Sequence, residues 1–142
     1  MRYYTLQPEV AGGMGSGTIL DSSTHPPRVS KLVYEFSGWL GDDLLETFPC
    51  YIVTARLKEA LEKLYPSGCD FDEVQVTKSD LFMEIHGDRE LPEFAWLKVT
   101  GRAGVDDFGL SAEHNVVASE RVLECMKRFS LAHCEVEQYR SK

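Results

Sequence analysis

The chain has 142 residues, of which 27% are charged and 43% are hydrophobic, the proportions of an ordinary soluble domain. Fifteen Lys and Arg against 23 Asp and Glu give a formal net charge of −8, which disfavours nucleic-acid binding because that binding depends on neutralising phosphates. We expect one cytoplasmic domain over residues 1–142 with no membrane partner, because no apolar run could span a bilayer and the N-terminus lacks the apolar core of a signal peptide.

The N-terminal region combines a short strand with a glycine-rich stretch. Residues 2–6 are rich in β-formers and are stopped by Pro8. The glycine-rich run at 11–18 has Thr18 where a P-loop needs Lys, and its glycines do not have the spacing of a dinucleotide-binding turn. We therefore expect a surface loop here, and no cofactor.

The middle of the chain predicts strands and one clear helix. Alternating apolar residues predict a strand over 29–36, and further strands are predicted over 49–53 and 71–77. A helix is predicted from Thr54 to about Tyr65, since apolar residues recur at helical spacing until a Pro-Ser-Gly stop. Residues 79–85 are ambiguous, although Ser79 is a suitable cap for a helical turn.

The C-terminal half predicts a similar series of elements. A strand is predicted over 94–101, a second helix begins after Ser119, and a final strand covers 133–139. Short strands and two main helices in this order predict an α+β fold, a single domain with short mixed or antiparallel strands.

A motif recurs in the two halves. Residues 37–43 and 100–107 both carry a hydroxyl residue, a Gly, two spacers, a second Gly and, directly or one residue later, paired aspartates. Each copy is followed by apolar residues at i, i+3, i+4 and i+7 of a predicted helix. These residues are Leu57, Ala60, Leu61 and Leu64 in the first copy and Val122, Cys125, Met126 and Phe129 in the second. The pattern predicts related strand–loop–strand–helix–strand units over 31–77 and 94–139, the alternative being chance similarity.

The paired aspartates suggest two different roles. If the copies face each other, Asp42 and Asp43 would meet Asp106 and Asp107, and four carboxylates would suit a hard cation or acid–base chemistry. This is the alternative hypothesis of a small cytosolic enzyme or metal-dependent hydrolase. Aspartates after glycine also form turns through their own backbone contacts, and we favour that interpretation.

The histidines and cysteines show no ligand spacing. The four histidines are scattered, with no His-x-x-x-His pattern, and the four cysteines form no Cys-x-x-Cys pair. We therefore predict no catalytic residue, no metal site and no enzyme activity, and we expect reduced, mostly buried thiols.

Several longer motifs are spread over nearly the whole chain. They are PEVAGG at 8–13, HPP at 25–27, GWLGDDL at 38–44, FPC at 48–50, LPEFAWLKVTG at 91–101, DDFGL at 106–110 and SER at 119–121. In these motifs the chain resembles the immunity proteins of bacterial polymorphic toxin systems, of the family known as immunity protein eleven and first described as a domain of unknown function. The resemblance implies an intracellular protein, encoded beside a secreted toxin, that binds and neutralises the toxin stoichiometrically and protects the producing cell.

We predict the partner-binding residues near the first copy of the repeat: Trp39, Asp42, Asp43 and Glu46. A Trp between glycines is hard to bury on all sides, and Arg102 replaces it in the second copy. Between Glu35 and Glu46 there are four acids and no base, so the acids would form a rim that attracts a basic toxin such as a nuclease. The alternatives are a Trp39 folded back over the sheet, and a scaffold or adaptor protein that binds without protecting the cell.

Overall fold

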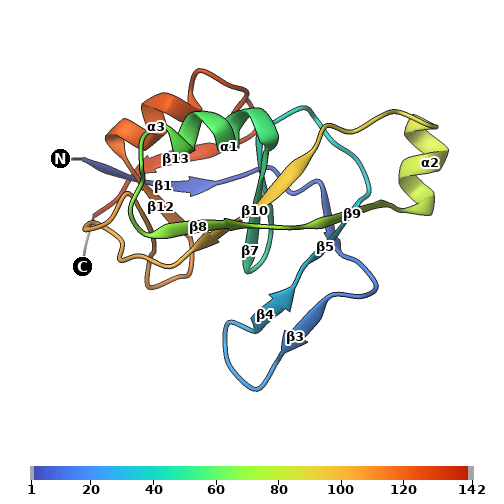
Figure 1. Cartoon of the computed structure of the whole chain (residues 1–142), viewed down its shortest axis with the longest axis horizontal. Helices are drawn as coiled ribbons and strands as arrows, with labels where there is room; N and C mark the ends of the chain where they lie inside the picture. Colours follow the sequence, from blue (N-terminus) through green and yellow to red (C-terminus); the bar gives the residue numbers. More distant parts are fainter. Residues whose placement is uncertain (1, 141–142) are drawn as a thin grey trace.

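The structure, a computed structural model, describes residues 2–140 and has an α+β fold, as predicted. Within these residues there are three helices and 13 strands, arranged in several small sheets (Figure 1). None of the helices in this part of the chain combines the length and apolarity needed to cross a membrane. The four cysteines are free, two of them buried and two half-buried, in agreement with the expectation of reduced thiols.

Two four-stranded antiparallel sheets form the body of the molecule. The first has the order β6 (Leu44–Thr47), β7 (Cys50–Thr54), β10 (Phe94–Val99) and β8 (Cys69–Asp72). The second has the order β11 (Phe108–Leu110), β12 (Val116–Ser119), β1 (Tyr3–Gln7) and β13 (Glu135–Gln138).

Two smaller sheets complete the strands. One has the order β2 (Gly12–Met14), β5 (Val33–Phe36) and β9 (Gln75–Lys78), with β5 and β9 parallel; the other pairs β3 (Ile19–Asp21) with β4 (Arg28–Lys31). The expectation of a surface loop at 11–18 is therefore wrong for β2. Glycine permits this pairing, because a Cβ on Gly12 would lie 1.9 Å from the carbonyl oxygen of Glu35.

The two predicted helices are present, together with a third. They are α1 (Ala55–Glu62), capped by Thr54, and α3 (Glu120–Met126), which follows Ser119. They lie side by side over the core in Figure 1, and their apolar faces, including Leu61 and Met126, are buried. The third helix, α2 (Asp80–His86), lies at the opposite end of the molecule and is capped by the hydroxyl of Ser79, which resolves the ambiguous segment.

The two four-stranded sheets are built alike. In each, a hairpin leads into a helix and then into an edge strand: β6–β7, α1 and β8 in one, β11–β12, α3 and β13 in the other. The strand between hairpin and edge comes from the other half of the chain, β10 in the first sheet and β1 in the second. The registers match, since Leu97 stands opposite Tyr51 as Leu6 stands opposite Val116, 65 residues after Tyr51.

The structure departs from the unit predicted over 31–77 in its leading strand. That part of the chain forms β4 and β5, which join separate small sheets, because β10 occupies the position beside β7. The strand predicted over 71–77 is likewise divided, since β8 pairs with β10 whereas β9 pairs with β5. The two halves therefore share the same order of elements only in their hairpin, helix and following edge strand.

Candidate functional site

The loop at 37–43, which leads from β5 to β6, is fixed by contacts from distant segments. Trp39 is half-buried rather than free: its ring meets Phe94 edge-on at 5.9 Å and lies 5.0 Å beneath the Arg89 guanidinium carbon. Its indole N–H donates to the Asp42 carbonyl oxygen at 2.9 Å. Trp39 therefore folds back over the sheet, which is the alternative considered above, although part of its side chain stays exposed.

Asp43 is buried, with 1% of its surface exposed, and is the centre of the first Asp–Arg cluster, formed by Asp43, Thr54, Arg56 and Ser130. Two nitrogens of Arg56 donate hydrogen bonds to the carboxylate at 2.8 and 2.7 Å. The Thr54 hydroxyl also donates a hydrogen bond, as does the Ser130 amide at 2.9 Å. Burial raises the pKa of Asp43, but the bonds from Arg56, Thr54 and Ser130 outweigh it and hold the pKa below its usual value. The carboxylate is structural, because its acceptor positions are all used within the fold.

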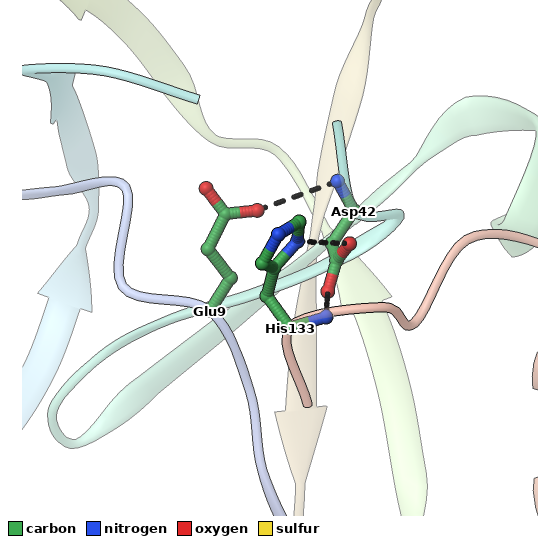
Figure 2. Close-up of side chains that lie close together, drawn as sticks. All are labelled: Glu9, Asp42 and His133. Carbon is green, nitrogen blue, oxygen red and sulfur yellow. Dashed lines mark hydrogen bonds and ion pairs between the residues drawn. The ribbon is translucent and has the colours of Figure 1, made fainter. Parts of the chain in front are cut away.

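Asp42 is fully buried and joins two other segments, as Figure 2 shows. One of its oxygens accepts from the His133 amide at 2.8 Å; the other lies 3.1 Å from His133 Nδ1 and accepts from the Ser130 hydroxyl. Glu9, 7% exposed, accepts from the amides of Leu40 at 2.7 Å and Asp42 at 3.3 Å. The group thus connects the segment after β1, the loop before β6 and the segment before β13.

Glu9, Asp42 and His133 are also the one group among residues 2–140 whose ligand atoms could hold a metal, since they lie within 4.8 Å of one another. Each of the four carboxylate oxygens, however, already accepts a hydrogen bond from this protein. The Ser130 hydroxyl donates to Asp42 rather than to His133, so no serine–histidine–aspartate relay is formed. The contacts explain the group as a tertiary cross-link.

The second copy of the motif forms the second Asp–Arg cluster, consisting of Asp107, Ser119, Arg121 and Ser67. Arg121 contacts Asp107 with two nitrogens at 3.0 and 2.7 Å, the Ser119 hydroxyl donates at 2.7 Å and the Ser67 amide at 3.0 Å. Chiefly through Arg121, these contacts lower the pKa of Asp107 to about 2 against the opposing effect of burial. The cluster repeats the contacts of the first one, with Ser119 in the place of Thr54 and Ser67 in the place of Ser130.

The four aspartates do not form the shared site of the enzyme hypothesis. Asp43 and Asp107 sit in separate Asp–Arg clusters, and Asp106 accepts from the amide of Arg102 at 2.8 Å, which makes it a turn-forming residue as expected. The metal-ligand group described above contains Asp42 but none of the other three. The hypothesis of a cation held by both pairs is therefore wrong for this geometry.

The structure does not show the acidic rim predicted around Trp39. Asp42 and Asp43 are buried and bonded, so they are not an uncompensated exposed pair. Glu46 is half-buried, and burial raises its pKa. A hollow of about 350 Å³ does lie beside Trp39 and Arg56, bounded on its other side by Pro92 and Glu93. Binding of a partner by Trp39, Asp42, Asp43 or Glu46 stays a prediction.

A larger groove, which the sequence reasoning did not identify, lies between β9 and residues 90–94. It has a volume of about 880 Å³, an apolar lining that includes Val76, Leu91 and Phe94, and three glutamates, Glu73, Glu90 and Glu93. Within residues 2–140 no salt bridge involves these glutamates, all of which are exposed. The excess of acids between residues 70 and 93 was visible in the sequence, but the groove arises from two segments that the fold brings together.

Compared with models of protein families and with curated proteins, the chain matches none of them.

Proposed function

We propose that the protein is an immunity protein, which binds a cognate bacterial toxin in a stoichiometric complex and protects the cytoplasm of the cell that makes both. Support comes from the sequence motifs described above and from the charge distribution of the surface. The observation that carries the proposal is the acidic segment at residues 70–93, in which seven of the eight acids make no salt bridge within residues 2–140. The proposed toxin is a basic protein, such as a nuclease, whose positive charge serves to bind an anionic substrate.

The acidic segment, residues 70–93, contains eight acids and two bases. Of the acids, Asp72 pairs with Lys98 at 2.7 Å, and the other seven make no salt bridge within residues 2–140. The side chains of both bases donate hydrogen bonds to backbone carbonyl oxygens of this chain. Lys78 donates to the Arg89 carbonyl oxygen at 2.6 Å, while Arg89 donates to the Trp39 carbonyl oxygen at 3.0 Å.

The same segment also carries exposed apolar side chains, which suit burial by a partner. On α2, Leu81, Met83 and Ile85 are between 47% and 61% exposed, whereas Phe82 holds the helix to the core. Acidic surroundings with exposed apolar residues suit a partner interface in which charge speeds the encounter and apolar contacts slow dissociation. Neutralisation would follow from covering the toxin's active site or preventing a movement that the toxin needs.

Co-expression with the toxin encoded by a neighbouring reading frame tests this proposal. We expect cells producing both proteins to survive and the purified proteins to inhibit in a stoichiometric ratio. Survival no better than with an empty vector would refute the proposal. A complex that forms without protecting the cell would instead support the scaffold or adaptor hypothesis.

A further inference from the structure

We infer that the groove between β9 and residues 90–94 is the docking site for an extended, basic segment of a partner protein, which pairs with β9 as an added strand. The inference rests on the proposed function only for the identity of that partner as a toxin. Its physical basis is the combination, in one groove, of a free strand edge, an apolar lining and uncompensated carboxylates.

The first component is the strand edge. β9 is the outermost strand of its sheet, paired on one side with β5. The amides of Gln75 and Ser79 donate to the carbonyl oxygens of Leu32 and Phe36 in the segment that contains β5. Because backbone groups of successive strand residues point to opposite sides, those of Val76 and Lys78 point away from β5. A strand edge of this kind binds an extended peptide through main-chain hydrogen bonds.

The second component is room for the side chains of that peptide. The groove of about 880 Å³ borders both β9 and residues 90–94, and the half-buried Val76, Leu91 and Phe94 line it. No backbone hydrogen bond joins β9 to residues 90–94 within the described part of the chain. Residues 90–94 therefore leave the edge of β9 open to another strand. Alternate apolar side chains of an added strand would contact this lining.

The third component is charge. Glu73, Glu90 and Glu93 border the groove, against Lys78 alone among the basic residues that line it. The Lys78 ammonium is held by the Arg89 carbonyl oxygen and lies 5.5 Å from the centre of the Phe82 ring, so it is not paired with these glutamates. The groove therefore favours a segment that carries Lys or Arg, and disfavours an acidic one.

A defined peptide tests the groove without the toxin. We would titrate acetyl-(Lys-Val)3-amide into the isotopically labelled protein and follow the backbone amide resonances. We expect the largest shifts at Val76 and Lys78, and loss of binding when the peptide is N-methylated at alternate residues. No binding at low millimolar peptide, equal binding of the acidic (Glu-Val)3 peptide, or shifts confined to another surface would overturn the inference.

Matched charge variants supply the control. The groove variant Glu73→Gln/Glu90→Gln/Glu93→Gln removes three exposed carboxylates, and Glu59→Gln/Glu62→Gln/Glu124→Gln removes three exposed carboxylates from α1 and α3. We expect the groove variant to weaken peptide binding at least about tenfold, and the control variant to change it less than about twofold. Equal loss in both variants would show a general effect of net charge and overturn the inference.

The same two variants, co-expressed with the toxin, separate this inference from the proposed function. If the wild-type protein protects and the groove variant protects equally well, the groove is not the toxin-binding site, and the proposed function stands. If the wild-type protein does not protect, the proposed function falls, and the peptide titration still decides whether the groove binds a basic strand.

Discussion

The two Asp–Arg clusters use the same contacts at equivalent positions in the two halves. In each, a buried aspartate binds an arginine with two nitrogens and accepts from the hydroxyl that precedes the helix. Each also reaches across the molecule. Asp43 holds Ser130 in the segment after α3, and Asp107 holds Ser67 in the segment after α1. The clusters thus bind the two halves to each other.

The aspartates that precede the clusters differ between the halves. Asp106 is half-buried and forms its own turn, whereas Asp42 is fully buried and bonds to Ser130 and His133. The second glycine of each motif, Gly41 or Gly104, has a positive φ in both copies, so the turn itself is shared. The second aspartate of each pair therefore belongs to the common scaffold, whereas the contacts of the first differ between the halves.

The largest expected effect tests whether the two helices are equivalent. Leu61→Asp and Met126→Asp each place a charge at a position that is 0% exposed, so each should cost more than about 4 kcal/mol and unfold the protein. Lys63→Asp and Lys127→Asp, at the exposed ends of the same helices, should cost less than about 1 kcal/mol. Circular dichroism and thermal melting measure both. A soluble, cooperatively melting core variant would contradict the equivalence.

The next effect compares the clusters themselves. Asparagine in place of aspartate removes the charge that holds the arginine and turns an NH2 group towards N–H donors. We expect Asp43→Asn to lower the free energy of unfolding by about 2–4 kcal/mol, and Asp107→Asn by about 1–3 kcal/mol, because Asp43 is 1% exposed and Asp107 is 9% exposed. Urea denaturation measures both, with Asp106→Asn as the control that should cost less than about 1 kcal/mol. A larger loss from Asp107→Asn than from Asp43→Asn would reverse the ranking.

A smaller effect separates the two interpretations of Trp39. Since its ring packs on Phe94 and Arg89, Trp39→Ala should lower the free energy of unfolding by about 2 kcal/mol. Trp39→Phe, which keeps much of the packing but loses the hydrogen bond to Asp42, should lower it by about 1 kcal/mol. An unchanged melting temperature together with weaker toxin binding would restore Trp39 as an interface anchor.

The smallest expected effect is on how steeply the stability of the protein depends on pH. The folded-state pKa of Asp107 is about 2 and its reference value is 3.8, so the unfolded chain binds more protons between these pH values. The contribution of Asp107 to stability is therefore complete above pH 3.8 and is lost as the pH falls towards about 2. Urea midpoints measured across this window should depend less steeply on pH in Asp107→Asn than in the wild-type protein. Identical slopes would mean that Asp107 is not held by Arg121 in solution.

Helix starts, buried helix faces and one turn could be predicted from the sequence, because each depends on residues close together in the chain. The helices begin where Thr54 and Ser119 precede helical apolar spacing, and their buried faces are those that the spacing indicates. The turn role of Asp106 follows from its neighbours in sequence. These features need no information from distant parts of the chain.

Features that depend on distant partners could not be predicted in the same way. The exchange of β1 and β10 between the halves is a choice between strand partners that each sequence segment alone does not specify. Trp39 was expected to be hard to bury on all sides because its neighbours are glycines, but the contacts that half-bury it come from Arg89 and Phe94, about fifty residues away. Asp42 and Asp43 looked uncompensated for the same reason, since Arg56 and His133 are supplied by other elements.

We propose that the acids of the two Asp–Arg clusters hold the fold, whereas the glutamates of the groove bind the partner. Measuring both the melting temperature and the affinity for the toxin, in Asp43→Asn and in Glu73→Gln/Glu90→Gln/Glu93→Gln, tests it most directly. We expect Asp43→Asn to melt at a lower temperature while its folded fraction keeps the wild-type affinity. The groove variant should melt like the wild-type protein and bind at least about tenfold more weakly. A groove variant with unchanged affinity, or Asp43→Asn with unchanged melting and weakened binding, would contradict the claim.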